Sequence, residues 1–141
     1  MKLSQESRQA LDALTYLARK PAGAVVESAK IAAALDVSPA FLSKILQRLG
    51  RAGFVTGHRG AVRGYSLARA AKGINVRDVA VAIDGDDLFN RCVFWSRPCS
   101  DSRPCILHGE WAKVRPQIER DLARLTIEEL AARSRRKRSP R

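Results

Sequence analysis

All three cysteines of the chain and one of its two histidines lie in a single short stretch, CVFWSRPCSDSRPCILHGEW. The cysteines are Cys92, Cys99 and Cys105, with the spacing C-x6-C-x5-C, and His108 follows soon after the last of them. Thiolates and imidazole are soft or borderline ligands, and four of them complete the coordination of zinc or of an iron–sulfur cluster. An odd number of cysteines argues against a disulfide framework. The stretch therefore predicts a metal site with these four ligands, and the residue types leave the metal open.

The residue types also allow other chemistry in this stretch. Structural zinc sites usually contain a C-x2–4-C knuckle, and the wider gaps here favour a loop around a larger cluster. Arg91, Arg97 and Arg103 lie near the cysteines and would favour thiolate, so a metal-free thiol switch is a second interpretation. Cysteines that merely pack as small apolar residues are a third, which the gathering of all three in one polar loop disfavours.

Two predicted helices flank the stretch. Asn75 is a suitable N-cap for the first, whose apolar positions include Val79 and Ile83. The second runs from about Pro104 to Leu125, and its apolar residues are spaced by three and four, as in a helix that pairs with another helix. These residues are Trp111, Val114, Ile118, Leu122 and Leu125. The capping-box spacing of TIEE then predicts a short terminal helix.

The first seventy residues predict three helices and a hairpin. Apolar residues at helical spacing mark helices around Leu11–Ala18 and in SAKIAAAL. Ser38 and Pro39 have the types of an N-cap and a first helical residue, and an apolar stripe follows them. Two short strands separated by a turn come next, around Phe54 and Leu67. This order is that of a winged helix-turn-helix, so the predicted fold is mainly α with a small β-hairpin wing.

The charge of the chain indicates a polyanionic partner. Lysine and arginine number 26 against 14 acidic residues, for a net charge of +12 in 141 residues. Nucleic acid is the simplest partner for such a chain, with an anionic membrane surface as the rival. The sequence contains neither a long apolar run nor the apolar core of a signal peptide, so we expect a cytoplasmic protein that does not enter a membrane.

The third helix and the wing carry the residues expected to meet DNA. The helix face opposite the apolar stripe presents small residues that allow close approach and basic or amide residues that bind phosphates or bases. In the wing, basic residues stand among glycines, where the backbone can approach a sugar-phosphate strand. The expected contacts are Ala40, Ser43, Lys44, Gln47, Arg48, Arg59 and Arg63. No pairing of acid and base residues suggests an enzyme.

Three segments of the chain resemble the Rrf2 family of bacterial transcription regulators. They are KLSQESRQALDALTYLA, IAAALDVSPAFLSKILQRLGRAGFV and RGAVRGYSLARAAKGINVRDVAVAIDG. The resemblance implies a homodimeric DNA-binding regulator, and the family includes iron–sulfur sensors with three cysteines at this place, some of which use a histidine after the third. It also implies DNA contacts at Ser38, Ala40, Phe41, Ser43 and Arg59.

The chain departs from the family pattern at several positions. Ala61, Val62 and Arg63 replace part of a glycine run in the wing, and Ser43 stands where some relatives carry an acidic selectivity residue. The gap between the first two cysteines is one residue longer than in the iron–sulfur assembly regulators. Some relatives take an acidic ligand from the first helix of the partner subunit, where this chain has Arg8.

These observations predict four parts: a winged helix-turn-helix domain with its following helix over 1–84, a cluster-binding loop over 85–104, a dimerisation helix and a short terminal helix over 105–131, and a basic disordered tail over 132–141. We expect a repressor that binds a pseudo-palindromic operator as a homodimer. An iron–sulfur cluster, 2Fe–2S in preference to 4Fe–4S, would control its affinity. The alternative is a regulator without a cluster that uses thiol oxidation or structural zinc.

Overall fold

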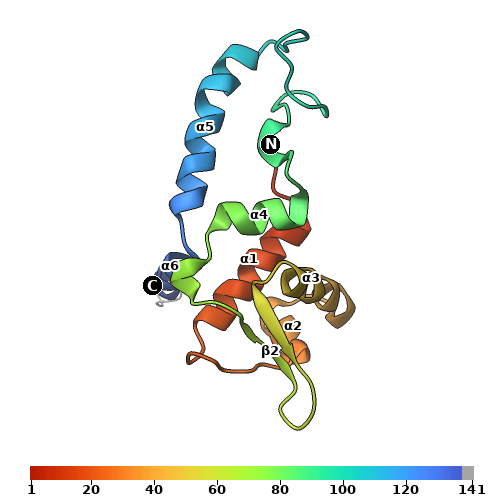
Figure 1. Ribbon diagram of the computed structural model, residues 1–141, viewed down its shortest axis with the longest axis vertical. Helices are drawn as coiled ribbons and strands as arrows, with labels where there is room; N and C mark the ends of the chain where they lie inside the picture. Colours follow the sequence, from red (N-terminus) through yellow and green to blue (C-terminus); the bar gives the residue numbers. More distant parts are fainter. Residues whose placement is uncertain (138–141) are drawn as a thin grey trace.

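The computed structural model describes residues 1–137, with side chains through Arg133, and its elements follow the predicted order (Figure 1). The helices and strands of the amino-terminal part are α1 (Gln5–Ala18), α2 (Ser28–Leu35), α3 (Pro39–Arg51), β1 (Val55–His58) and β2 (Gly64–Leu67). The remaining elements are η1 (Ala71–Gly73), α4 (Val76–Asp84), η2 (Leu88–Asn90), α5 (His108–Arg124) and α6 (Ile127–Lys137). The prediction of a mainly helical chain with one hairpin is confirmed.

Side-chain caps define where the helices begin. Ser38 accepts a hydrogen bond from the Phe41 amide at 3.1 Å, and Asn75 accepts one from the Asp78 amide at 2.9 Å. These contacts satisfy N–H groups that have no partner within the first helical turn. Both caps were predicted from the sequence, and they set the starts of α3 and α4.

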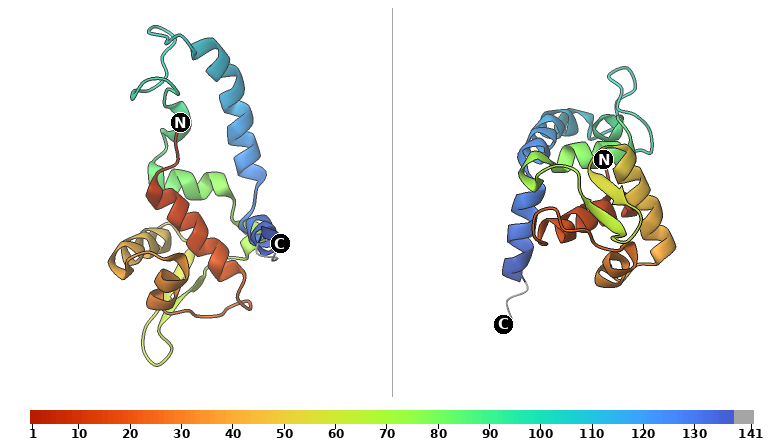
Figure 2. Two further views of the ribbon diagram at one scale, coloured as in Figure 1. Left: turned by 180° about the vertical axis from the view of Figure 1, so that it is seen from behind. Right: turned by 60° about the horizontal axis from the view of Figure 1, so that its bottom comes forward.

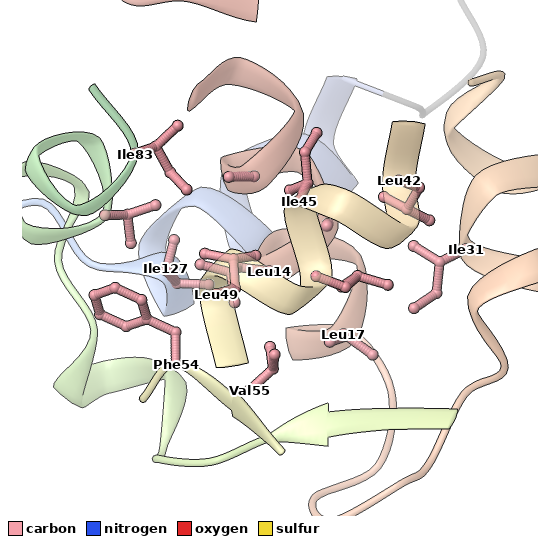
Figure 3. Close-up of a cluster of buried hydrophobic side chains, with 14 of the residues drawn as sticks. Leu14, Leu17, Ile31, Leu42, Ile45, Leu49, Phe54, Val55, Ile83 and Ile127 are labelled. Atoms are coloured by element: carbon pink, nitrogen blue, oxygen red, sulfur yellow. The ribbon is translucent and has the colours of Figure 1, made fainter. Parts of the chain in front are cut away.

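The main core lies between α1, α3, the hairpin and the start of α6 (Figure 3). Leu42, Ile45, Leu46 and Leu49 give α3 one fully buried face. Leu14 of α1 packs in the same cluster. Burial of such side chains stabilises the fold by about 1.5–3 kcal/mol each, so the core fixes the position of α3 on α1.

A third extended segment joins the hairpin. β1 and β2 pair antiparallel, with Val55 opposite Leu67 and His58 opposite Gly64. Val26, just before α2, exchanges two backbone hydrogen bonds of 2.9 Å with Tyr65 of β2. The wing is therefore attached to the helix-turn-helix on its inner edge, and only its tip extends from the domain.

Helix α5 extends away from the core and carries the cysteine loop at its far end (Figure 1). None of its 17 residues is buried. Ile118 and Leu122 pack on a small second cluster formed by Ala80, Leu88 and Phe89. The wing tip and the cysteine loop lie at opposite ends of the long axis. Figure 2 shows α5 and α6 along one side of the molecule and α2 and α3 along the other.

The carboxyl end of α5 is fastened to the DNA-binding domain. The Val76 amide donates to the Leu125 carbonyl at 2.9 Å, and the Ile127 amide donates to the Ile74 carbonyl at 2.9 Å. The Ile127 side chain is fully buried in the main core. The start of α6 therefore belongs structurally to the amino-terminal domain.

Two predicted boundaries are wrong. Helix α5 begins at His108 and not near Pro104, because the chain first makes a turn in which the His108 amide donates to the Cys105 carbonyl at 3.1 Å. Helix α6 continues to Lys137, so the tail predicted to be disordered from residue 132 is helical up to that point. Its remainder, 138–141, lies outside the described residues. Within residues 1–137, no helix is long and apolar enough to cross a membrane.

Gly64 provides a test of the wing attachment. A Cβ atom at this position would overlap the Val26 carbonyl oxygen, and its φ of +142° is itself unfavourable for other residues. Gly64→Ala should lower the free energy of unfolding by about 2–3 kcal/mol, measured by denaturant unfolding. Gly60→Ala is the control, because it has a positive φ but open space, and it should cost only about 1 kcal/mol. Equal losses for the two variants would contradict the predicted clash.

Candidate DNA-binding surface and cysteine loop

The exposed face of α3 presents most of the predicted DNA-contacting residues. Ala40, Lys44 and Gln47 are exposed, and Ser43 is half-buried between them. Ser38, also exposed, uses its hydroxyl oxygen to cap the helix. The apolar stripe holds the helix on the core while this face remains open, which is the arrangement a recognition helix needs to enter the major groove.

The wing adds basic residues beside the start of α2. Arg59 and Arg63 are exposed, and with Ser28 and Tyr65 they line a groove of about 510 Å³. His58 differs from them, because its ring is half-buried and its Nε2 lies 2.8 Å from the Ser66 hydroxyl. Two arginines thus line one groove, together with Glu27 at the start of α2, and their guanidinium groups can bind phosphate oxygens.

Two predicted contacts lie differently from the others. Arg48 Nη2 donates a hydrogen bond to the Ile83 carbonyl at the end of α4. One nitrogen of its guanidinium is therefore engaged within the protein, and its contact with DNA stays a prediction. Phe41 is half-buried and packs against the main core, which leaves only part of its ring accessible.

Backbone hydrogen bonds fold the first part of the cysteine loop into a short hairpin. The Cys92 amide donates to the Arg97 carbonyl at 2.8 Å, and the Cys99 amide donates to the Asn90 carbonyl at 2.7 Å. Arg91 and Pro98 form an isolated antiparallel bridge between them. This small hairpin places Cys92 and Cys99 on neighbouring strands, but it does not direct both sulfurs to one point.

Cys92 and Cys105 are the two cysteines that the fold brings together. Their Sγ atoms lie 3.5 Å apart. Two thiolates bound to one tetrahedral ion at about 2.3 Å would lie roughly 3.8 Å apart, so this pair fits two positions of a metal site. The Trp95 and Phe94 amides both donate to Cys92 Sγ at 3.3 Å. The amide of Trp95 is the main cause that lowers the pKa of the Cys92 thiol below its ordinary value, despite the opposing effect of burial.

The other two predicted ligands point elsewhere. Cys99 Sγ lies 3.7 Å from the Arg91 carbonyl oxygen, and His108 Nε2 lies 2.8 Å from Asp101 Oδ1. Within residues 1–137, no three His, Cys, Asp or Glu side chains are grouped closely enough to hold a metal ion. Of the four predicted ligands, the fold therefore brings together the sulfurs of Cys92 and Cys105, while Cys99 and His108 contact other groups of the loop.

Several features of the loop are not evident from the sequence. Asp101, which lies between the second and third cysteines, is the partner of His108. The Trp111 indole Nε1 donates to the Arg91 carbonyl at 3.2 Å and so fastens the loop to α5. Phe94 and Trp95 are about half exposed and stack edge to face, with ring centroids 5.0 Å apart. An acidic residue among candidate ligands is the one signal that would have indicated Asp101.

Comparison with known proteins agrees with this architecture. The model of the Rrf2 family, described as iron-dependent transcriptional regulators, matches residues 3–133. The chain belongs to the Rrf2 family. Rrf2 members are transcription regulators and not enzymes, and this chain is a winged-helix DNA-binding regulator of that kind.

Curated relatives extend the match over most of the chain. HTH-type transcriptional regulators of Azotobacter vinelandii and Aquifex aeolicus are each 30% identical to it. The match covers 95% of this chain and 81% of the Azotobacter protein, and 92% and 91% for the Aquifex protein. The HTH-type transcriptional regulator IscR of Xenorhabdus nematophila is 29% identical, covering 92% of this chain and 79% of that protein.

Solved structures of the same fold include three regulators. CymR of B. subtilis, described as the global cysteine regulator, matches with a TM-score of 0.80 and 23% identity, over 94% of this chain and 98% of that chain. IscR of T. potens matches with a TM-score of 0.77 and 23% identity, and the match covers 100% of this chain and 93% of that chain. The oxidised form of Staphylococcus aureus CymR matches with a TM-score of 0.74 and 25% identity, and the match covers 93% of this chain and 96% of that chain.

The exposed face of α3 and the wing tip lead to a quantitative prediction. Lys44→Ala and Arg59→Ala should each weaken operator binding by about 1 kcal/mol, or roughly fivefold, because each removes an exposed positive charge. Each should also reduce the slope of log affinity against log salt concentration by about one, measured by fluorescence anisotropy with an operator duplex. Lys113→Ala, which removes an exposed lysine from α5, is the control and should leave that slope unchanged. An unchanged slope for Lys44→Ala or Arg59→Ala would exclude that residue from the interface.

Proposed function

We propose that this protein is a homodimeric repressor whose operator affinity is controlled by an iron–sulfur cluster bound to Cys92, Cys99, Cys105 and His108. The observation that carries the proposal is the Cys92–Cys105 sulfur pair, with two backbone amides directed at Cys92 Sγ. Amide hydrogen bonds stabilise thiolate, the form in which cysteine binds metal. The iron-dependent description of the Rrf2 family supports iron in preference to zinc.

Cys99 and His108 have the freedom to complete the set. Both lie in or beside a loop whose residues 91–108 are half-buried or exposed, so their movement disturbs no buried packing. His108 must give up its contact with Asp101, which itself is fully exposed and can be solvated instead. A bound cluster supplies redox and ligand-exchange chemistry that responds to iron supply, oxygen or nitric oxide. Cys92, Cys99, Cys105 and His108 would hold the cluster, and the imidazole would leave it more readily than a thiolate.

The proposed dimer is formed by α5 of two subunits. This helix has no buried residue in the single chain, and Val114 of its predicted seam is 49% exposed. Ile118 and Leu122 of the seam pack on the second cluster but stay half exposed, so the seam still presents apolar surface that a second copy of the helix can cover. Two-fold symmetry would then present two α3 helices to successive major grooves, and this favours a pseudo-palindromic operator.

The same sulfur pair favours a second candidate function, a thiol switch without a cluster. A peroxide would oxidise the Cys92 thiolate to a sulfenic acid, and the Cys105 thiol would then displace water to form a disulfide. The separation of 3.5 Å between the sulfurs makes this step geometrically accessible. The structural similarity to an oxidised form of CymR supports this alternative. A structural zinc ion on the same ligands is the third outcome.

Anaerobic purification separates these functions. A brown protein with iron and acid-labile sulfide in equal amounts, and with operator affinity that changes when the cluster is removed, supports the proposal. A colourless protein with one zinc per chain supports structural metal. A colourless metal-free protein in which peroxide joins Cys92 to Cys105, detected by mass spectrometry of peptides, supports the thiol switch.

The ligand assignment is tested residue by residue. Cys92→Ala, Cys99→Ala and Cys105→Ala should each lose the visible absorbance and the bound iron while the apo dimer stays folded. His108→Ala should retain a cluster that is lost more quickly in air, since the imidazole is the weakest of the proposed ligands. His58→Ala is the matched control, because it removes the other histidine, which bonds to Ser66 in the wing. Normal iron content in all three cysteine variants would refute the assignment.

A further inference from the structure

The end of α4 accepts hydrogen bonds from three other parts of the chain. The last carbonyl groups of a helix have no partner within it, and they lie at the negative end of the helix dipole. Donors with positive charge are therefore favoured at this position. In this protein the donors come from α3, from the start of α1 and from the base of the cysteine loop.

Two arginines use neighbouring carbonyls at this end. Arg48 of α3 donates to the Ile83 carbonyl, and Arg91 Nη2 donates to the Asp84 carbonyl at 2.8 Å. The first arginine lies on the recognition helix, and the second directly precedes Cys92. The end of α4 is thus a shared acceptor for the DNA-binding element and the cysteine loop.

The side chain of Asp84 holds α1 at the same point. Its carboxylate accepts from the Ser4 amide at 3.0 Å and also from the Ser4 hydroxyl. Ser4 in turn caps α1 through the Ser7 amide. Gly85, with a φ of +101°, then lets the chain leave the helix. Helices α1, α3 and α4 are therefore joined where the cysteine loop begins.

Arg91 connects this junction to the proposed ligands. Its carbonyl oxygen accepts from Trp111 Nε1 at 3.2 Å and lies 3.7 Å from Cys99 Sγ. Its side chain reaches back to Asp84 and also bonds to Asp87 at 3.0 Å. Any rearrangement that redirects the Cys92 and Cys99 sulfurs therefore moves a backbone whose side chain is anchored on α4.

We propose that Arg91 is the positioning residue that transmits the state of the cysteine loop to the recognition helix, through the α4 end that it shares with Arg48. The loop and the wing tip lie at opposite ends of the molecule, so a cluster cannot act on DNA by direct contact (Figure 1). When the loop rearranges, Arg91 changes its hold on the last turn of α4, and the Ile83 carbonyl that fixes Arg48 moves with that turn. The inference rests on the proposed function, because it requires two loop states.

The test compares operator affinity with and without the cluster. For the unaltered protein we expect the two affinities to differ by about tenfold, within the usual range for coupled sites. In Arg91→Gln the ratio should fall to within about twofold of one, while iron content stays normal. Arg120→Gln is the matched control, since it removes an exposed arginine whose guanidinium donates to the Gln117 side chain and contacts neither α4 nor the cysteine loop in any hydrogen bond of the described residues. It should keep the original ratio.

Each outcome has a distinct meaning. If Arg91→Gln binds its cluster and keeps the original ratio, Arg91 does not transmit the signal and the inference is overturned. If the unaltered protein binds the operator equally well with and without its cluster, the proposed function itself is wrong, and the inference about Arg91 falls with it. Should Arg91→Gln unfold at a much lower temperature than the unaltered protein, Arg48→Gln decides the question from the other side of the junction. In Arg48→Gln the ratio of the two affinities should also fall toward one, and Arg91→Lys should keep part of the original ratio.

Discussion

Ile127 is buried in the same apolar core as Leu14 and Leu49, although the whole of α5 separates it from that core in the sequence. This burial, together with the backbone bonds of Val76 and Ile127, fixes the carboxyl end of α5 to the DNA-binding domain. The helix then extends from a fixed base, and its amino end carries the cysteine loop. The apolar seam of α5 and the position of the loop both depend on this anchor, because no residue of α5 is itself buried.

Contacts between α5 and α4 fix the direction in which α5 leaves the DNA-binding domain. Arg77 of α4 and Glu119 of α5 form an ion pair at 2.9 Å, and Ile118 packs on the second cluster beside Phe89. The ion pair is partly exposed and contributes little by itself, so the apolar contact stabilises the position of α5 more than the ion pair does. Trp111 completes the arrangement by bonding to the base of the loop. The loop is thus held at both ends while its middle stays open to solvent, which leaves it room for the rearrangement that the proposed cluster would require.

Local and periodic features of the sequence predicted the helices of the DNA-binding domain. Ser38 and Asn75 act as caps, and the buried stripe of α3 follows its apolar spacing, because both effects depend on neighbours within a few residues. Contacts between residues far apart in the sequence could not be predicted in this way. Arg48 lies on the polar side of α3 in any helical projection, and only the nearness of α4 shows that it bonds to Ile83. The loop behaves similarly: the sequence predicted four ligands, but it did not show that the folded loop brings together the sulfurs of Cys92 and Cys105.

Residues 91–107 of the cysteine loop lie outside both apolar clusters, and this separation has an evolutionary consequence. Residues in the loop can be exchanged with little penalty in folding, since the hydrophobic cores of the DNA-binding domain and of the α4–α5 contact do not include them. New donor atoms, altered gaps or the loss of a ligand would be tolerated while the operator-reading scaffold persists. Regulators with this fold can thus come to respond to a different signal through substitutions in one peripheral segment. Two members that share the fold therefore need not respond to the same signal.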